Sequence, residues 1–428
     1  MPIQTLCVIG LGYIGLPTAC MFATHGVRVV GVDNNPGIIK SLNSGQVHIK
    51  EPGIQELVDQ VQINNQLTVS TSVQPCDAYL IAVPTPFHED KSADLSFVKA
   101  AAEAIQPHLN PGNLVVLEST SPPRTTLDVV APILEKSGLK AGSDFFLVYS
   151  PERVLPGKIL EELVNNTRVI GGVNTTSAVA GKQLYGSFVK GEIILTDATT
   201  AEMVKLMENT FRDINIAAAN EFSRLAERFG VDIWEAIELA NRHPRVQILN
   251  PGPGVGGHCI SVDPWFLVEA APEQSELIRT ARNVNDAQPL FVVQILQQKY
   301  GNLDGRNIAV LGLAYKPDVD DLRESPAIHT AEILIKASAH VSVYEPFKLD
   351  AHISGAKTAD SLESVVRGAE VILLLVNHSQ FRSIDPKALS LLTGPIFVLD
   401  CVSGWNREIW QAAGFKYHRL GDGKQRDA

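Results

Sequence analysis

The chain has 428 residues, which is enough for two to three domains that each bury a core. Its hydrophobic fraction of 45% and charged fraction of 19% are those of an ordinary globular protein. The net charge of -11, without any basic run, argues against nucleic-acid binding. A locally basic pocket for a small phosphorylated molecule remains compatible with this composition.

Cysteine usage and hydropathy bear on the compartment. The cysteines are odd in number, scattered and without C-x-x-C spacing, as in a reducing compartment: Cys7, Cys20, Cys76, Cys259 and Cys401. The N-terminus lacks the basic region of a signal peptide, and the longest apolar run, 371–376, is too short to span a bilayer. We therefore expect a cytoplasmic protein without membrane or nucleic-acid partners.

A glycine-rich motif lies between two predicted strands at the start of the chain. An apolar run predicts a buried strand at 6–9, and the motif Gly10-x-Gly12-x-x-Gly15 follows it. After a helical pattern, a second buried strand ends at Asp33, 18 residues beyond the last glycine. This is G-x-G-x-x-G in the strand, turn, helix, strand setting that dinucleotide binding requires.

The residue types in this motif also indicate which dinucleotide binds. The glycines let the backbone approach a pyrophosphate at the helix N-terminus, and we assign this contact to Gly10, Gly12, Tyr13, Ile14 and Gly15. Asp33 would accept hydrogen bonds from the adenosine ribose and repel a 2′-phosphate, and the next three residues contain no Arg to hold one. We therefore predict NAD rather than NADP.

Two further strand ends are predicted to face the cofactor. The buried strands 78–83 and 114–117 lead to Thr85 and Thr120. Ligands of open α/β sheets bind beyond the carboxyl ends of the strands, which would bring both threonines to the nicotinamide half. The alternative is that they only cap turns.

A third strand, 145–149, runs into a loop rich in turn residues that carries Glu152 and Arg153. Glu152 is suited to hold a catalytic water, and Arg153 to pair with a phosphate or sugar oxygen. The alternative is a surface ion pair, which contributes little.

A long helix is predicted over 196–230, with Asp197, Thr199 and Thr200 as candidate N-caps and Gly230 as its stop. Lys205, Asn209 and Arg212 form one polar stripe on it, opposite apolar residues. Such a stripe is most often a solvated face. Because a long helix between two domains is buried on several sides, we expect this stripe to face a ligand. A buried lysine loses its proton readily, which suits it to proton transfer.

In the stretch 250–266, Pro251 and Pro253 exclude regular helix, and four glycines allow close approach of the backbone to a ligand. It leads to Cys259, with Asp263 four residues on. If a helix begins near His258, both share one face, and its first N–H groups favour the thiolate. This predicts covalent catalysis followed by attack of water. The alternative is that Cys259 is a small buried hydrophobic residue.

Cationic residues precede this stretch. His243 and Arg245, with Arg242, would favour anions near the thiolate. A metal held by His243, His258, Cys259 and Asp263 fits none of the common zinc spacings, so we predict no metal.

Further buried strands at 306–312, 340–344, 371–376 and 396–400 predict a second doubly wound half. Its first turn lacks G-x-G-x-x-G, but Lys316 and Arg323 are suited to meet a nucleotide's phosphates, unless this is only a charged loop. The loop ends at Ser325-Pro326, a cap followed by proline at the first helical position. The tail from Gly421 is polar, and we expect it to be disordered.

Taken in order, these motifs resemble the nucleotide-sugar 6-dehydrogenase family. The residues that carry the resemblance are Gly10-x-Gly12-x-x-Gly15, Val83-Pro84-Thr85-Pro86, Glu118-Ser119-Thr120, Ser150-Pro151-Glu152-Arg153, Lys205-x-x-x-Asn209, Gly256-Gly257-His258-Cys259-x-x-x-Asp263 and Lys316-Pro317-Asp318-x-Asp320-Asp321-x-Arg323-x-Ser325-Pro326. Such an ordered set, covering nearly the whole chain, is more specific than any one motif.

The resemblance implies an α/β protein with two doubly wound Rossmann-like domains joined by a helical core with one long central helix. Its parts would be an NAD-binding domain (1–196), a helical dimerisation core carrying Lys205 and Cys259 (197–300), and a UDP-binding domain (301–428). The implied reaction oxidises the C6 hydroxymethyl of a UDP-sugar to a carboxylate, with two NAD+ and one water. A homodimer through the central helix is also implied.

The resemblance also suggests the sugar. Residues 153–157, 241–245 and 251–259 look like the branch that acts on UDP-N-acetylmannosamine (UDP-ManNAc), whereas the UDP-glucose branch usually carries an aromatic residue in its glycine-rich loop. We expect UDP-ManNAc first, UDP-GlcNAc next and UDP-glucose last. The residues themselves do not show how C2 of the sugar is read.

Roles follow from the resemblance. Lys205 would assist proton removal, Cys259 would attack the aldehyde, Asn209 would stabilise the oxyanion, and Asp263 with Glu152 or Thr120 would orient water. Arg323 is assigned to the cofactor. The substrate set is Arg153, Val154, Lys205, Asn209, Arg212, His243, Arg245, Gly256, Tyr315 and Lys316, with Arg245 reaching in from the partner subunit.

Two other classes of function compete with this one. The first is a two-electron dehydrogenase of the hydroxyacid type, with Lys205 catalytic and Cys259 structural. The second is a non-catalytic sensor of NAD or nucleotide sugars.

Overall fold

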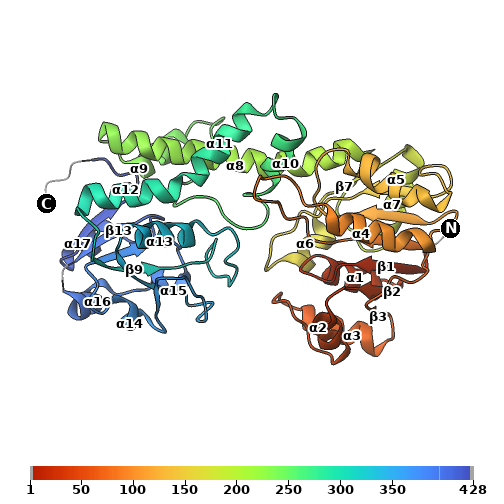
Figure 1. Ribbon diagram of the computed structural model, residues 1–428, viewed down its shortest axis with the longest axis horizontal. Helices are drawn as coiled ribbons and strands as arrows, with labels where there is room; N and C mark the ends of the chain where they lie inside the picture. The colour runs from red at the N-terminus through yellow and green to blue at the C-terminus, as the bar shows by residue number, and fades with distance from the viewer. Residues whose placement is uncertain (1–2, 395, 425–428) are drawn as a thin grey trace. The chain divides into compact units, whose positions relative to one another are not determined.

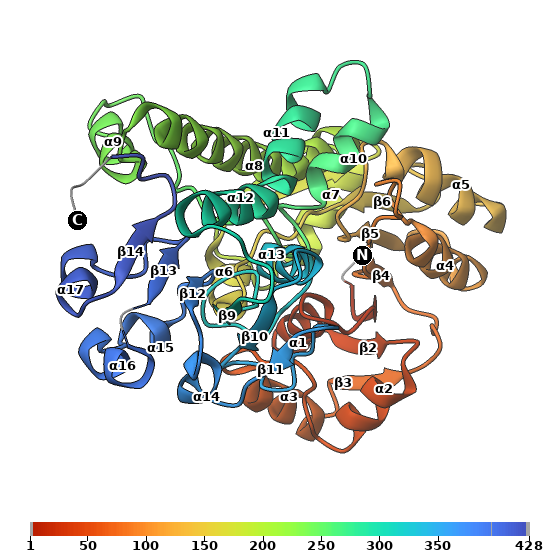
Figure 2. The same ribbon diagram turned by 60° about the vertical axis from the view of Figure 1, so that its left-hand side comes forward.

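The computed structural model describes residues 3–394 and 396–424 (Figures 1 and 2). The chain divides into two compact units. The N-terminal unit comprises Met1–Glu208 and Trp265–Pro272, and the C-terminal unit comprises Asn209–Pro264 and Glu273–Ala428.

The N-terminal unit is built on an eight-stranded sheet with the order β3-β2-β1-β4-β5-β6-β7-β8. Its strands are β1 (Thr5–Ile9), β2 (Arg28–Val32), β3 (Leu67–Ser70), β4 (Ala78–Ile81), β5 (Leu114–Leu117), β6 (Phe146–Tyr149), β7 (Arg168–Gly172) and β8 (Ile193–Asp197). Neighbouring strands run parallel except β6 and β7, which are antiparallel. The sequence analysis predicted five of these strands and did not include β3, β7 or β8.

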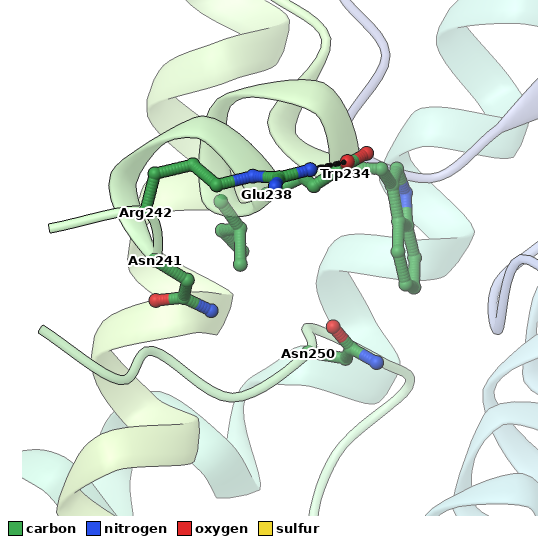
Figure 3. A pocket seen from close by; sticks show the side chains of 6 residues that line it. Trp234, Glu238, Asn241, Arg242 and Asn250 are labelled. Carbon is green, nitrogen blue, oxygen red and sulfur yellow. Dashed lines mark hydrogen bonds and ion pairs between the residues drawn. The ribbon is translucent and has the colours of Figure 1, made fainter. Parts of the chain in front are cut away.

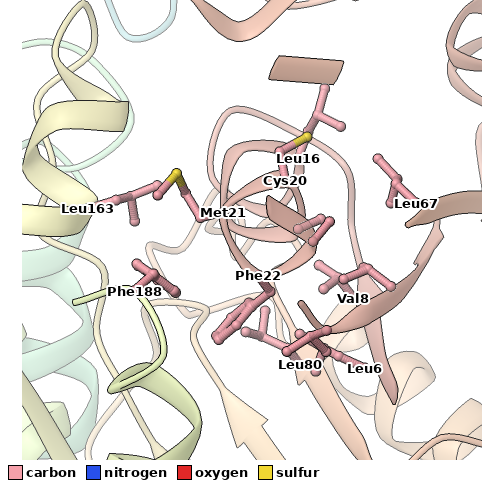
Figure 4. Close-up of a cluster of buried hydrophobic side chains, with 14 of the residues drawn as sticks. Leu6, Val8, Leu16, Cys20, Met21, Phe22, Leu67, Leu80, Leu163 and Phe188 are labelled. Carbon is pink, nitrogen blue, oxygen red and sulfur yellow. The ribbon is translucent and has the colours of Figure 1, made fainter. Parts of the chain in front are cut away.

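Helices cover both faces of this sheet. They include α1 (Gly15–Thr24), α2 (Pro36–Asn43), α3 (Ile54–Ile63), α4 (Ser96–Ile105), α5 (Ala131–Leu134), α6 (Ile159–Asn165) and α7 (Thr175–Tyr185). Because side chains alternate along a strand, Leu6 and Val8 of β1 enter one core cluster while Cys7 and Ile9 enter another. Figure 4 shows the first cluster, in which Phe22 of α1 is labelled beside strand residues.

The C-terminal unit contains a six-stranded, all-parallel sheet with the order β11-β10-β9-β12-β13-β14. Its strands are β9 (Asn307–Leu311), β10 (His340–Tyr344), β11 (Lys357–Thr358), β12 (Val371–Leu374), β13 (Phe397–Asp400) and β14 (Lys416–Arg419). Its helices include α13 (Pro326–Lys336), α14 (Leu362–Val366), α15 (Ser379–Arg382), α16 (Pro386–Thr393) and α17 (Arg407–Ala412). The predicted cap is confirmed, since the Ser325 side chain accepts a hydrogen bond from Ala327 N.

The predicted long helix is confirmed as α8 (Ala198–Phe229), 32 residues long. Asp197 caps it by accepting a hydrogen bond from Thr200 N at 2.9 Å. Four more helices belong to the central region: α9 (Ile233–Ala240), α10 (Asp263–Ala270), α11 (Glu276–Asp286) and α12 (Gln288–Tyr300). The fold prediction of two doubly wound halves and a helical core with one long helix is therefore confirmed.

Two local predictions are wrong. The helix expected near His258 begins at Asp263 instead, because Pro264 is tolerated in the first helical turn but would break a helix that had begun earlier. The tail is not disordered from Gly421, because Gly421 N donates to the Glu227 carboxylate at 3.1 Å and Asp422 forms a bridge with Asp232. Residues 425–428 lie outside the described part of the chain.

Within the described residues, none of the helices combines the length and the apolar character that a bilayer crossing requires.

Candidate active site

The glycine turn after β1 is shaped to admit a ligand. A Cβ on Gly15 would overlap the carbonyl oxygen of Gly10, so α1 can start this close to the turn only with glycine there. Gly12, in contrast, has open space where its side chain would be. The residues present therefore fit a pyrophosphate that approaches the backbone at Gly12.

Asp33 lies at the end of β2, where the ribose of a dinucleotide is recognised. Its carboxylate accepts hydrogen bonds from Leu11 N at 3.0 Å and from Asn35 N at 2.9 Å. These bonds fix the carboxylate beside the glycine turn. The arrangement agrees with the preference for NAD over NADP, since an anion at this position disfavours a 2′-phosphate.

The ends of β4 and β5 meet as predicted. The Thr85 hydroxyl donates to the carbonyl oxygen of Thr120 at 2.6 Å, and the Ser119 hydroxyl donates to Val83 O at 2.7 Å. Both threonines are partly exposed. Thr85 therefore does more than cap its own turn, because it joins the two strand ends at the carboxyl edge of the sheet.

The alternative prediction of a surface ion pair is wrong for Glu152, whose side chain is buried, whereas Arg153 does form a partly exposed ion pair. The Glu152 side chain is only 8% exposed and pairs with Arg168 at 2.5 Å. Arg153 pairs with Glu208 of α8 at 2.6 Å and also donates to Thr167 O. The neighbouring Val154 is partly buried against the core of this unit. The sequence analysis did not identify Arg168, because the strand that begins with it was not predicted.

The polar stripe on α8 is buried over part of its length. Lys205 and Asn209 are 9% and 8% exposed, as expected for residues that do not face solvent. Arg212, which was predicted to share this environment, is exposed. The stripe is therefore buried for one helical turn, from Lys205 to Asn209, and is exposed at Arg212.

The C-terminal part of α8 positions the glycine- and proline-rich loop that precedes Cys259. The Asn215 side chain accepts from Leu249 N and the Asn220 side chain from Gly252 N, each at 2.9 Å. Asn220 in turn donates to the buried Asn285 of α11 at 2.9 Å. These amide side chains satisfy backbone groups that the loop, having no regular structure, cannot pair internally.

Cys259 lies in a turn that leads directly into α10. Its carbonyl oxygen accepts from Asp263 N at 2.8 Å, so the two residues are one helical turn apart as predicted, although α10 starts only at Asp263. Asn209 donates to the buried Asp263 carboxylate at 2.6 Å. Cys259 is partly exposed, whereas the other four cysteines are buried. A small buried hydrophobic residue is therefore not a fitting description of Cys259.

The charged loop between β9 and α13 packs against the Cys259 loop within the C-terminal unit. Gly257 N donates to Arg323 O at 3.0 Å, and the Arg323 guanidinium lies 3.2 Å from His258 Nδ1. Hydrogen bonding to Asp321 raises the pKa of Arg323, and the nearby Cys259 contributes to the same rise. Arg323 is thus a cation within electrostatic range of the sulfur.

Two further residues of this loop were assigned to the substrate. The Lys316 ammonium lies 5.6 Å from the centre of the Tyr315 ring, and both side chains are partly exposed. A phosphate or uracil recognised here would meet one cation and one aromatic face.

A steric prediction follows from Gly256. A Cβ there would lie 2.5 Å from the carbonyl oxygen of Glu324 and 2.9 Å from Cβ of Tyr315, and a backbone oxygen cannot swing aside. We expect Gly256→Ala to destabilise the protein by about 1–3 kcal/mol and to lower its melting temperature by several degrees. Gly252→Ala is the matched control, because no atom lies within 4 Å of its added Cβ. Equal melting temperatures for both variants in calorimetry would contradict the packing argument.

The segment around His243 lies on the surface. His243 and Arg245 are exposed, and His243 Nδ1 accepts from Arg245 N at 3.3 Å. Nearby, a hollow of about 370 Å³ is lined by Trp234, Ile237, Glu238, Asn241, Arg242 and Asn250 (Figure 3). Of the residues named in the sequence analysis as favouring anions, it contains Arg242 but not His243 or Arg245. Among residues 3–394 and 396–424, no three His, Cys, Asp or Glu side chains gather as a metal-binding group.

These features together define the class of the protein. One unit carries a dinucleotide turn with an acidic strand end, and the other carries a second doubly wound sheet and a partly exposed cysteine in a glycine-rich loop. These features are typical of a dinucleotide-dependent oxidoreductase that contains two doubly wound sheets.

Comparison with known proteins gives the family. Three models of the UDP-glucose/GDP-mannose dehydrogenase family match in succession: the NAD binding domain at residues 4–189, the central domain at 199–287 and the UDP binding domain at 309–407. The chain belongs to this family. It is an NAD-dependent dehydrogenase with a UDP-binding domain, as the motifs predicted.

Full-length relatives agree with this assignment. The chain is 46% identical to a UDP-N-acetyl-D-mannosamine dehydrogenase of Methanocaldococcus jannaschii, over 98% of this chain and 97% of that one. It is 48% identical to an NDP-N-acetyl-D-galactosaminuronic acid dehydrogenase of Ralstonia nicotianae, over 90% and 93%. The solved structure of a UDP-D-ManNAc dehydrogenase from Pyrococcus horikoshii matches with a TM-score of 0.91 and 43% identity, over 98% and 100%.

Proposed function

We propose that this protein oxidises the C6 hydroxymethyl group of UDP-N-acetyl-D-mannosamine to a carboxylate through a covalent intermediate on Cys259. The observation that carries the covalent route is the turn from Cys259 to Asp263. It presents a partly exposed thiol one helical turn before a buried carboxylate that Asn209 holds at 2.6 Å.

Similarity to relatives supports the choice of sugar. Two of the proteins described above are named for N-acetylmannosamine, and a third for an N-acetylgalactosamine derivative. All three names share an N-acetylated amino sugar. This favours UDP-ManNAc and places UDP-GlcNAc before UDP-glucose among the alternatives.

In the first half of the reaction, Lys205 accepts the proton of the C6 hydroxyl, directly or through water, as a hydride leaves C6. Bound NAD+ supplies the acceptor for this hydride and for the second one. The Cys259 thiolate then adds to the aldehyde carbon and forms a thiohemiacetal. Lys205 and Asn209 stabilise the oxyanion that develops in this addition.

In the second half, loss of another hydride from C6 leaves a thioester on Cys259. A water molecule attacks the thioester carbon, its proton passes to a carboxylate, and the C–S bond breaks to release the acid and the thiolate. We assign the orientation of this water to Asp263 with Glu152 and Thr120. Because the aldehyde remains covalently held, it need not leave the site between the two oxidations.

The remaining site residues have binding roles. We assign the dinucleotide to the turn from Gly10 to Gly15, with Asp33, Thr85, Thr120 and Arg323. The sugar and the diphosphate are assigned to Arg153, Val154, Arg212, His243, Arg245, Gly256, Tyr315 and Lys316. The reduced thiols and the nature of the substrates support a cytoplasmic location.

Counting NADH tests this proposal. We expect two NADH per molecule of UDP-ManNAc consumed, with turnover of UDP-GlcNAc and UDP-glucose at lower kcat/KM. A two-electron dehydrogenase of the hydroxyacid type would release one NADH per substrate, and a sensor would release none. Thermal shifts with the same three UDP-sugars identify which of them bind in the absence of turnover.

We also propose a homodimer formed through the helical core (197–300), supported by the exposed apolar side chains of α8. Met207 is 55% exposed, and Phe211 and Phe229 are each 72% exposed, on a helix whose buried stripe contains polar residues. Exposing these side chains to water costs free energy that a second helix would recover. By family resemblance, Arg245 would reach the partner's site across this interface.

Sedimentation tests the dimer. We expect Phe211→Glu to sediment as a monomer at concentrations where the unmodified protein is a dimer. Leu391→Glu is the matched control, because Leu391 is 88% exposed but lies on α16. A monomer with full activity in the unmodified protein would exclude both the dimer and the contribution of Arg245.

A further inference from the structure

Glu152 belongs to a buried cluster of charged residues in the N-terminal unit. The cluster brings together Glu118 after β5, Glu152 after β6, Arg168 at the start of β7 and Tyr185 at the end of α7. Glu118 and Arg168 are 3% and 4% exposed. Charged groups this deeply buried are costly unless they are paired, so their arrangement calls for an explanation.

The direction of β7, which runs against β6, creates the cluster. Strands β1 to β6 run parallel to one another, and their carboxyl ends share one edge, whereas β7 and β8 run in the opposite direction. β7 runs antiparallel to β6, with Val148 opposite Gly172 and Tyr149 opposite Gly171. Three residues further along, the same register brings position 168 opposite 152. The first residue of β7 therefore lies at the edge where Glu152 lies.

The Arg168 guanidinium contacts the carboxyl groups of both Glu152 and Glu118. Arg168 donates to Glu152 Oε2 at 2.5 Å and, from its other terminal nitrogen, to Glu118 Oε1 and Ser150 Oγ at 3.2 Å. Tyr185 donates to the same Glu118 oxygen at 2.9 Å. Glu118 Oε2 has no hydrogen-bond partner among the described residues. The shorter contact shows that Arg168 is committed mainly to Glu152.

A protonated Glu118 agrees with the closer contact of Arg168 to Glu152. Burial, and then the negative charge of Glu152, raise the pKa of Glu118 to about 7, against the smaller opposing effects of Arg168 and Tyr185. Burial alone would lower the pKa of Arg168, but the charge of Glu152 and its other neighbours raise it, so the guanidinium stays charged. At pH values below about 7, where Glu118 is protonated, the cluster therefore holds one cation and one anion, Arg168 and Glu152.

A small space adjoins this pair. It measures about 10 Å³, close to the minimum that one water molecule occupies, and Glu152, Arg153 and Arg168 are among its lining residues. The second Glu152 oxygen accepts from Arg153 N at 2.6 Å, so both oxygens are held. A carboxylate fixed at both oxygens beside a water-sized space is arranged to orient that water.

We propose that Arg168 is a positioning residue that fixes the Glu152 carboxylate for thioester hydrolysis, and that Glu118, while it carries a proton, leaves the charge of Arg168 to Glu152. This inference rests on the proposed function. In the step concerned, the water oxygen bonds to the thioester carbon, a water proton passes to Glu152, and the C–S bond breaks with its electron pair on sulfur. When Glu118 loses its proton, it competes for Arg168 and loosens Glu152.

The test follows the enzyme-bound acyl group rather than overall rate alone. Enzyme, UDP-ManNAc and NAD+ are mixed and quenched in acid, and the Cys259 adduct is measured by intact mass. We expect Arg168→Gln to form NADH in the first turnover at the normal rate but to hydrolyse the adduct at least roughly 10-fold more slowly, so that the adduct accumulates. Arg306→Gln, which breaks an exposed Arg–Glu pair, is the matched control.

A double substitution separates positioning from general damage. If Arg168 acts through Glu152, Arg168→Gln adds little to the slowing caused by Glu152→Gln, because both remove one function. Additive losses, or a parallel loss of first-turnover NADH, would overturn the proposal in favour of a structural role. Adduct hydrolysis within twofold of the unmodified enzyme would overturn it as well.

The pH dependence of hydrolysis provides a second test, should Arg168→Gln fail to fold. The groups that face Glu118 are Arg168 from β7, Tyr185 from α7 and Glu152 from the loop after β6. Hydrolysis in the unmodified enzyme should slow as pH rises through about 7, because Glu118 then ionises. Glu118→Gln should move this alkaline limb to higher pH, and an unmoved limb would overturn the role of Glu118.

The stoichiometry distinguishes this inference from the function on which it rests. One NADH per sugar in the unmodified enzyme would overturn the four-electron reaction and this proposal together. Two NADH per sugar, without adduct accumulation in Arg168→Gln, would overturn only the role of Arg168.

Discussion

Cys259→Ser is expected to abolish formation of the uronic acid, by roughly three orders of magnitude or more in rate. A serine hydroxyl at this position is a far weaker nucleophile than a thiolate, so the aldehyde would not be captured for the second oxidation. In the proposed mechanism the first oxidation does not use the sulfur, so at most one NADH per sugar should form. Product analysis by mass spectrometry should therefore find no acid, and NADH should not exceed one equivalent.

Cys76→Ser is the matched control for this substitution, because Cys76 is only 8% exposed and lies in no proposed site. It should retain both oxidations. If Cys259→Ser formed acid at nearly the unmodified rate, Cys259 would not be the nucleophile. The two-electron alternative, in which Cys259 is structural, would then become the better explanation.

Alkylation of the native protein provides an independent check of the thiol. Burial raises the pKa of Cys7 and of Cys20 to about 12, so these two remain unreactive thiols at pH 8. Cys259 is the partly exposed cysteine, with Arg323 nearby. Iodoacetamide should therefore label Cys259 first, and UDP-ManNAc should protect it. Labelling that the nucleotide sugar does not affect would argue against a site at this thiol.

The features predicted well from sequence are those with a local physical cause. The glycine turn and Asp33 belong to one continuous strand, turn, helix and strand, whose spacing is set by the backbone. The cap at Ser325 is a similar case, since a cap depends on one side chain and the next few N–H groups. Periodicity likewise defined the long helix nearly to its ends.

Features that depend on tertiary contacts were missed or misplaced. No local pattern shows that β7 runs against β6, so Arg168 could not be placed beside Glu152. The run Val169-Ile170 gives a weak strand signal, but not its direction. Similarly, the helical period gives the angle between Lys205 and Arg212 without telling where burial ends along that face, and Arg212 proves to be exposed.

Helix α8 exposes apolar side chains and buries polar ones, and this pattern also depends on tertiary contacts. A surface helix ordinarily buries its apolar side chains, yet Phe211 is exposed while Lys205 and Asn209 are buried. Intrachain packing accounts for the buried polar stripe if the stripe serves the chemistry, and the proposed partner subunit would account for the exposed apolar residues. Sequence periodicity alone cannot distinguish these two kinds of surface.

Lys205→Ala is expected to lower kcat by a factor of about 10² or more, the usual effect of removing a general acid–base group. That loss corresponds to roughly 2.7 kcal/mol of transition-state stabilisation. The Lys205 side chain is 9% exposed and lies one helical turn before Asn209, which bonds the Asp263 carboxylate. In the proposed mechanism, removing the amine would leave the C6 hydroxyl without its proton acceptor and the oxyanion without a cation.

Steady-state kinetics with saturating NAD+ measure this effect, with Lys182→Ala on the exposed part of α7 as the matched control. Loss of a proton acceptor should lower kcat more than it raises KM for the sugar, and a small primary amine added to the assay should restore part of the rate. A rise in KM alone would make Lys205 a binding residue only. An unchanged kcat would reject its catalytic role and leave the first proton transfer to another group.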